Sequence, residues 1–214
     1  MKKEIGALLK KYRARKSEIE QRLLHFKKIG MSSPQTLFEE LAFCMLTPQS
    51  KAFSCDQAIE ELKQRNLLFT GGVLRIRDVL SRKTRFHNKK AVYLVGAREK
   101  FASNNFALLK KITFEGSEQH ARGILLREVK GIGWKEASHY LRNLGRGKSI
   151  AILDRHILKN LVKYGAIRGL PKSLTAKRYL EIERRMSLFC KKIGIPMSHL
   201  DLLFWAEETG KVFK

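Results

Sequence analysis

The sequence is poor in the residues that build disulfide frameworks, metal clusters and flexible linkers. Its 214 residues include three cysteines and four prolines, and Cys44, Cys55 and Cys190 form no CxxC pair. Isolated cysteines are typical of core thiols in a reduced, intracellular protein. The six histidines and three cysteines show no ligand spacing, so we expect no metal site and no cofactor.

Long apolar runs are missing as well. No stretch of about 18 apolar residues occurs, and the basic N-terminus leads into an amphipathic pattern instead of the apolar core of a signal peptide. We therefore expect a soluble, cytoplasmic protein without a membrane partner. No repeat, low-complexity segment or Pro/Ser-rich linker is visible, so any domain division must be one in which the chain crosses back and forth.

Acidic residues are scarce relative to basic ones. The chain has 20 Asp+Glu against 44 Lys+Arg, a formal net charge of +24. A positive field of this size favours a polyanionic partner, through phosphate neutralisation and counterion release. A ribosomal-type protein, a membrane-surface binder and a lysine-rich proteome are the alternatives. Because the charge is spread along a patterned globular chain and not gathered in a tail, we favour nucleic acid.

Apolar residues recur at spacings of three and four along most of the chain, which predicts amphipathic helices. One long helix, or two consecutive ones, should cover 3–29, and another should run from a Ser33 N-cap to about Leu46. A third should end near Arg65 with Phe53 facing inward. With about ten helices and no hairpin-type turns, the fold should be all-α.

Two glycines one residue apart, Gly131 and Gly133, separate two apolar-periodic segments between positions 124 and 146. Glycine permits backbone angles and close approaches that other residues avoid, so the pattern predicts a tight connection between two helices. The N–H groups of Gly131, Ile132 and Gly133 would then be available to a phosphate at the start of the second helix. We interpret the stretch as a helix-hairpin-helix that holds a nucleic-acid backbone.

Lys135 lies in the first turn of the second helix, where the macrodipole is positive and favours the uncharged amine. A free amine can attack the anomeric C1′ of a nucleoside, expel the base and leave a Schiff base that leads to strand cleavage by β-elimination. Charge statistics alone would instead make Lys135 one of many solvated lysines.

Asp154 follows nineteen residues after Lys135. It would cap a helix, or stabilise positive charge on a sugar and move a proton, or do both. The apolar run before it, Ile150 to Leu153, has no alternating segment to pair with as a strand, so we expect a buried loop.

The sequence VKGIGWKEA, with LDRH placing Asp154 nineteen residues after Lys135, resembles the helix-hairpin-helix superfamily of DNA glycosylases. Lysine at position 135 is similar to the bifunctional members, which are glycosylases and abasic-site lyases. The iron–sulfur branch carries four C-terminal cysteines, and Cys190 alone in that region excludes it. The segments LTPQS at 46–50, RFHNKKA at 85–91 and DLLFWAEETGKVFK at 201–214 resemble the second family of 8-oxoguanine DNA glycosylase/lyases, known from archaea and some bacteria.

The resemblance implies an extruded 8-oxoguanine held between aromatic rings, Trp205 and Phe86, with Lys214 and its free carboxylate reading the base edge. Gln49 would lie near the gap that the base leaves. Without the resemblance, Trp205 on an amphipathic final helix would be assigned to the core. The basic run at 82–90 would equally suit a solvated loop with Phe86 buried.

These patterns together predict two helical subdomains with a cleft between them, one formed by 31–153 with the hairpin at about 124–146, the other by 1–30 plus 154–214. The predicted protein is a monomeric bifunctional enzyme that excises 8-oxoguanine from double-stranded DNA and nicks the abasic site. A glycosylase/lyase for oxidised pyrimidines is one alternative. A non-catalytic helix-hairpin-helix module, in which Lys135 only touches phosphate, is another.

Overall fold

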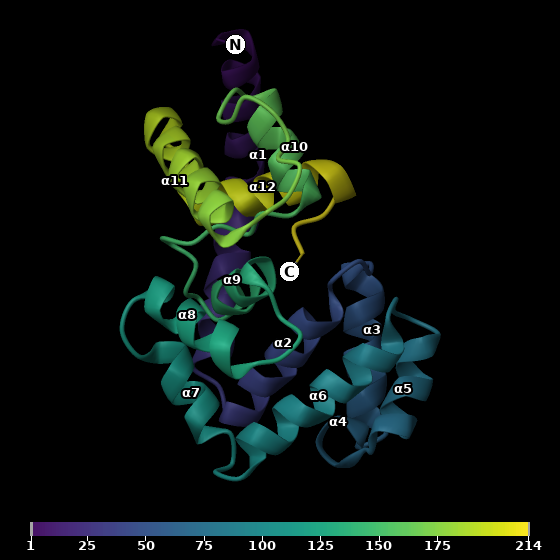
Figure 1. The fold of residues 1–214 in the computed structure, drawn as a ribbon. Coiled ribbons are helices and arrows are strands. Elements are labelled where there is room, and N and C mark those ends of the chain that lie inside the picture. The colour runs from purple at the N-terminus through teal and green to yellow at the C-terminus, as the bar shows by residue number, and fades with distance from the viewer. Residues whose placement is uncertain (1, 214) are drawn as a thin grey trace.

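The computed structural model describes residues 2–213, which form twelve helices and no strand (Figure 1). The all-α prediction is therefore confirmed. The helices in chain order are α1 Lys2–Gly30, α2 Pro34–Leu46, α3 Ala52–Gln64, α4 Leu67–Thr70, α5 Val73–Ser81, α6 His87–Ala102, α7 Ala107–Phe114, α8 Glu118–Glu128, α9 Trp134–Asn143, α10 Arg155–Lys163, α11 Ala176–Ile193 and α12 Met197–Thr209.

Side-chain caps fix where several of these helices begin. Ser33, Ser117, Asp154 and Thr175 each accept a hydrogen bond from a backbone N–H in the first turn of α2, α8, α10 and α11, respectively. Such bonds satisfy N–H groups that have no partner within the helix. Pro34 occupies the first position of α2, where the missing N–H costs nothing.

The first turn of α3 departs from the sequence-based expectation. Phe53 was expected to face inward, but its side chain is 65% exposed, and this prediction is wrong. The inward face of α3 is formed by Cys55, Ala58, Ile59 and Leu62. Phe53 lies in the first turn, outside the i, i+3, i+4 stripe that these residues define. The short helix α4 was also not predicted from the sequence.

Two hydrophobic cores are present. The first contains buried residues from Leu37 to Ile150, contributed by α2 to α9, and the second combines α1 with residues from Ala151 to Val212. Figure 1 shows the second set of helices above the first, with α1 reaching down to α9. The chain changes core between Ile150 and Ala151. The predicted subdomain limits, 31–153 and 1–30 plus 154–214, stay a prediction.

The segment Ile150 to Leu153 is a buried loop, as predicted, and α11 holds it with side chains in place of a partner strand. The N–H of Ala151 donates to Glu183 Oε2 at 2.7 Å, and the Tyr179 hydroxyl donates to the Ala151 carbonyl at 2.6 Å. The N–H of Leu153 donates to the Tyr179 hydroxyl at 3.2 Å. These bonds fix the backbone that leads to Asp154.

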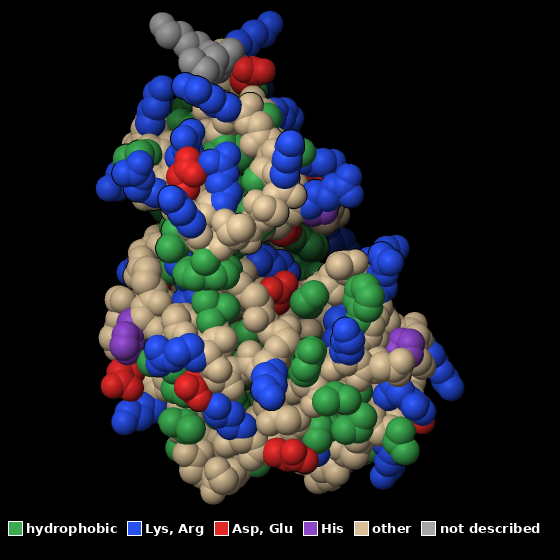
Figure 2. Space-filling view, viewed as in Figure 1, with side chains coloured by type: hydrophobic (Ala, Val, Ile, Leu, Met, Phe, Trp, Pro, Cys, Tyr) green, Lys and Arg blue, Asp and Glu red, His purple; other side chains and the backbone are tan. Residues whose placement is uncertain are grey.

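Basic side chains cover much of the surface, most densely over the part built from α1, α10, α11 and α12, and the surface is hollowed below that part (Figure 2). Among the helices described, none is long and apolar enough to cross a membrane.

Candidate active site

A cleft of about 1250 Å³ lies where the two cores meet. One wall comes from the loop between α2 and α3 and from α9; the other comes from the loop before α10, from α12 and from the C-terminal tail. The lining residues that matter for its chemistry are Thr47, Gln49, Phe53, Lys135, Glu136, Asp154, Asp201, Trp205 and Phe213. The cleft therefore brings together side chains that are far apart in the sequence.

The connection between α8 and α9 is the tight turn that the sequence predicted. Gly131 has φ +90°, and a Cβ there would lie 2.4 Å from Cδ2 of Tyr93, so glycine is required both by the backbone angle and by the packing. Gly133 is the N-cap of α9, which begins at Trp134. This geometry places Lys135 in the first turn of α9, at the edge of the cleft.

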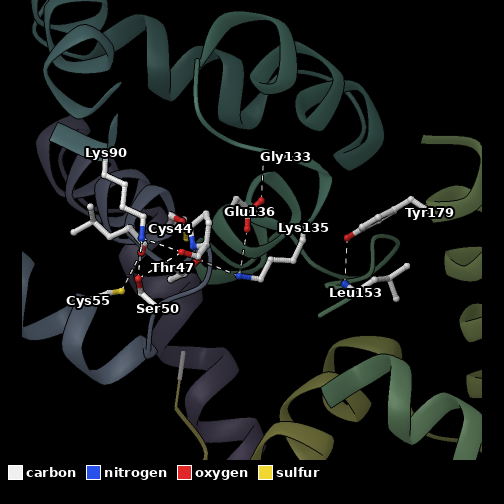
Figure 3. A network of polar contacts seen from close by, with 12 residues as sticks. Cys44, Thr47, Ser50, Cys55, Lys90, Gly133, Lys135, Glu136, Leu153 and Tyr179 are labelled. Atoms are coloured by element: carbon white, nitrogen blue, oxygen red, sulfur yellow. Dashed lines mark hydrogen bonds and ion pairs between the residues drawn. The ribbon is translucent and has the colours of Figure 1, made fainter. Parts of the chain in front are cut away.

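Lys135 is held by a residue at the end of α2, a helix that packs on α9. Its Nζ donates to Thr47 Oγ1 at 3.0 Å, and the Thr47 hydroxyl donates to the Cys44 carbonyl at 2.9 Å (Figure 3). Because its proton is used on Cys44, the Thr47 oxygen presents a lone pair to the amine. Oε1 of Glu136 lies 3.5 Å from the same Nζ.

A buried lysine secures the loop that carries Thr47 and Gln49. Lys90 Nζ donates to the carbonyls of Leu46 and Pro48, at 2.7 and 2.9 Å, and to Ser50 Oγ at 2.8 Å. Removal of the ammonium from water lowers the pKa of Lys90 to about 8. Gln49 has φ +53° and is exposed to the cleft. One buried cation thus fixes the conformation of this loop through three hydrogen bonds.

Asp154 lines the opposite wall of the cleft, where it is also the N-cap of α10. Its Oδ1 accepts from the N–H of Ile157 at 2.8 Å. Within the part of the chain that the structure describes, the ion pair of Lys135 is with Glu136 and not with Asp154. The structure thus brings Lys135 and Asp154 into one cleft without direct contact between them.

Two aromatic rings lie together at the α12 side of the cleft. The ring centroids of Trp205 and Phe213 are 6.3 Å apart, with an interplanar angle of 37°. Phe213 was not singled out from the sequence and Phe53 was assigned to the core, because nothing in their spacing distinguishes a cleft aromatic from a core aromatic. Phe86 is elsewhere: it precedes α6 with φ +57°, is 53% exposed and does not line the cleft. Lys214 lies outside the described residues.

The floor of the cleft contains a buried ion pair. Arg142 Nε lies 3.2 Å from Asp201 Oδ2, and the Arg142 guanidinium also covers the ring of Phe26. Burial raises the pKa of Asp201 to about 6, against the opposing effect of Arg142. Sequence patterns place Asp201 on the last helix but carry no signal of this burial, which depends on α9.

The hairpin N–H groups are not equally available to a phosphate. The N–H of Gly133 donates to Glu136 Oε2 at 3.1 Å, which is the half of a capping box that the residue at N3 supplies. This N–H is thus occupied by a carboxylate of the same chain, and its contact with a DNA phosphate stays a prediction. Gly131 is exposed and Ile132 is half-buried, and their contacts with DNA stay predictions.

A glycine hairpin, a lysine in the first turn of the following helix and a carboxylate across a shared cleft define a helix-hairpin-helix protein of the DNA glycosylase type. The comparisons with known proteins narrow this class. A family model described as 8-oxoguanine DNA glycosylase matches residues 19–195. The chain therefore belongs to the 8-oxoguanine DNA glycosylase family.

Relatives of known name agree over nearly the whole chain. A protein of Fusobacterium nucleatum named 8-oxoguanine DNA glycosylase/AP lyase is 43% identical over 205 residues, which is 95% of this chain and 94% of that one. The crystal structure of the 8-oxoguanine DNA glycosylase of Thermotoga maritima is similar, with a TM-score of 0.88 at 32% identity and full coverage of both chains. The Methanocaldococcus jannaschii 8-oxoguanine glycosylase/lyase, solved with a 15mer DNA containing 8-oxoguanine, gives a TM-score of 0.85 at 34% identity, covering 97% of this chain and 100% of that one.

Proposed function

We propose that the protein removes 8-oxoguanine from double-stranded DNA and then cleaves the strand at the abasic site. The observation that carries this function is the position of Lys135. It lies at the mouth of the hairpin, in the cleft, and is held by Thr47 at 3.0 Å. A lysine that only touched phosphate would need neither a cleft beside it nor a dedicated acceptor beneath it.

Chemistry begins once the damaged nucleotide is turned out of the helix into the cleft. Nζ of Lys135 forms a bond to C1′ as the bond from C1′ to the base breaks, and the base leaves with the electron pair. Ring opening gives the Schiff base. Loss of a proton from C2′ and departure of the 3′ phosphate complete the β-elimination.

Asp154 supports the departure of the base. Its carboxylate lines the same cleft, and we assign to it the stabilisation of positive charge on the sugar as the base leaves. Its role as N-cap of α10 holds one oxygen on the N–H of Ile157, so the cap also fixes the position of the carboxylate.

The base is expected to stack on Trp205, and Phe213 supplies a second ring beside it. Stacking replaces the neighbours that the base loses when it leaves the duplex. We assign Gln49, exposed at the cleft edge, to the space that the base vacates. The resemblance assigns reading of the base edge to Lys214, and the sandwiching ring to Phe86.

The DNA backbone would follow the basic surface seen in Figure 2, with Gly131 and Ile132 contacting a phosphate at the hairpin. Both catalytic residues and the cleft come from a single chain, so we propose that the enzyme acts as a monomer.

Borohydride trapping tests the function directly, because it reduces the Schiff base to a stable protein–DNA adduct. We expect an adduct between the wild-type protein and a duplex with one 8-oxoguanine opposite cytosine, and none with Lys135→Gln, which should still bind the DNA. Duplexes with an unmodified guanine or an oxidised pyrimidine are the substrate controls. If the wild type binds the 8-oxoguanine duplex and forms no adduct, the proposal is wrong. Preferential trapping on the oxidised pyrimidine would favour the alternative substrate class.

A further inference from the structure

Among residues 2–213, the carboxylate closest to the reacting amine belongs to Glu136, the residue directly after Lys135. Oε1 of Glu136 lies 3.5 Å from Lys135 Nζ, and its side chain is 13% exposed where it lines the cleft. Asp154 makes no ion pair with Lys135 among the residues that the structure describes. A nitrogen that forms a bond to C1′ must lose a proton before it can become a Schiff base, so the acceptor of this proton has to be near Nζ.

We propose that Glu136 is a catalytic residue that accepts this proton and later returns it to the sugar. The proposal rests on the function above. As Nζ of the uncharged amine bonds to C1′, an N–H bond breaks and its proton moves to Glu136 Oε1. The electrons left on nitrogen then form the C=N bond as the C1′–O4′ bond breaks, and O4′ takes the proton from Glu136. The carboxylate is thus regenerated, and no further reactant is consumed.

The hairpin orients the two oxygens of this carboxylate differently. Oε2 accepts the N–H of Gly133 at 3.1 Å, which leaves Oε1 on the side of Lys135 (Figure 3). A Cβ at position 133 would lie 3.2 Å from Oε2, so the glycine also leaves room for the carboxylate. One glycine therefore serves both the turn and the placement of the proton acceptor.

Thr47 and Asp154 have other roles, and neither is placed to accept the proton from Lys135. The Thr47 hydroxyl has its proton on the Cys44 carbonyl and accepts from Lys135, so it orients the amine while Glu136 takes the proton. Asp154 has Oδ1 on the N–H of Ile157 and lies across the cleft, on the side that stabilises the sugar.

Other charged and titratable groups surround the pair and enter any pH profile. Those that face it are Cys55 on α3, Lys90 on α6, His139 and Arg142 on α9, Asp154, Arg155 and His156 at the start of α10, and Asp201 on α12, with Lys51 and Lys211 at the cleft rim. All of these side chains are still present in a variant at position 136, so the two profiles differ through Glu136 itself and through the lower pKa of Lys90 once the Glu136 charge is removed.

The test compares wild type with Glu136→Gln on a duplex that contains a preformed abasic site, so that base departure is bypassed. Glutamine keeps an oxygen for the Gly133 N–H but is no base. We expect the single-turnover rate of borohydride trapping to fall by about 100-fold near pH 7, the lower end of the usual contribution of general base catalysis. The deficit should shrink as pH rises toward about 9.5, because hydroxide replaces the missing base.

Two outcomes would overturn the inference: a wild-type rate at every pH, or a rate lowered by the same factor at every pH, which a purely structural cap would give. Glu181→Gln, the same change at an ion-paired site on α11, is the matched control and should trap like wild type. If the wild type itself forms no adduct, the proposed function fails. If the wild type forms the adduct and Glu136→Gln has the same pH profile, the proposed function stands and this inference fails.

Glu136→Ala provides a second measurement that does not depend on the stability of the glutamine variant. With the side chain removed, added acetate at constant ionic strength should restore the trapping rate by about 10-fold, since a small carboxylate can occupy the vacated space. An equal concentration of chloride should have no effect. An alanine variant that acetate does not accelerate would contradict the proposed proton transfer.

Discussion

The amine of Lys135 and the hydroxyl of Thr47 are joined by a 3.0 Å hydrogen bond across 88 positions of sequence. The hydroxyl donates its own proton to Cys44, at the end of the same helix, so the pair has a fixed donor and acceptor. Thr47 therefore determines where the lysine nitrogen lies before DNA binds.

Thr47→Val should lower the rate of covalent trapping by about 10-fold, since loss of one hydrogen bond to a charged group corresponds to roughly 1.5–3 kcal/mol, part of which a mobile amine recovers in water. Valine keeps the shape of threonine, so binding of the duplex should change little. Thr47→Ser is the matched control, because it retains the hydroxyl. Equal rates for valine and serine variants would show that the hydrogen bond has no role in catalysis.

Asp154→Asn should greatly reduce turnover of the 8-oxoguanine duplex while binding is kept. The asparagine oxygen can still accept the N–H of Ile157, so the cap on α10 and the thermal stability should survive. Asp154→Ala loses the cap as well and should be destabilised by about 0.5–2 kcal/mol. An Asp154→Asn enzyme with normal single-turnover excision would leave this residue as a cap only.

The aromatic residues make separable predictions about the base. Stacking on an aromatic ring contributes about 1–3 kcal/mol per base, so Trp205→Leu should weaken productive binding of 8-oxoguanine by roughly 10- to 100-fold. Phe213→Leu should have a smaller effect in the same direction. Phe86→Leu tests whether the second ring is Phe86, as the resemblance implies, or Phe213, as the cleft geometry suggests. A large loss of productive binding would place Phe86 on the base in the complex, and unchanged binding would favour Phe213. Single-turnover excision at varied enzyme concentration measures all three.

Asp201 predicts a pH dependence of stability. Burial raises its pKa from 3.8 to about 6, so between these values the folded state binds more protons than the unfolded state. This group's contribution is therefore full below about pH 4 and is lost as pH rises to about 6, by roughly 2–3 kcal/mol. Urea unfolding at pH 4 and pH 7 checks it. The free energy of unfolding of Asp201→Asn, relative to that of the wild type, should be higher at pH 7 than at pH 4. A difference that is equal at both pH values would contradict the raised pKa.

Local signals in the sequence were sufficient for most of the fold. Ser33 and Asp154 cap helices as expected, because a cap is made within a few residues and is visible as a short pattern. The Gly131 turn and the buried loop before Asp154 were also predicted. Phe53 was placed in the core, because a single aromatic in the first turn of a helix fits either face.

Contacts between distant segments account for what was missed at the site. No spacing links Thr47 to Lys135 or Arg142 to Asp201, since those pairs form only when separate helices pack. Glu136 directly follows Lys135 in the sequence, but its proposed role depends on which of its oxygens accepts the Gly133 N–H. Family resemblance named Trp205, whereas only the structure places Phe213 next to it.

Lys135 and Asp154, on opposite walls of the cleft, are anchored in different cores. Ala137, in the same helix as Lys135, packs in the first core, while Leu153, next to Asp154, packs in the second and is tied to Tyr179. Any rotation of one core against the other changes the separation between Lys135 and Asp154. A duplex bound in the proposed way would lie against both, and its resistance to bending is lowest where a base pair is already weakened. We infer that the mechanical compliance of the DNA helps to set the alignment of the two groups, so that a stiff, undamaged site is disfavoured before any base edge is read.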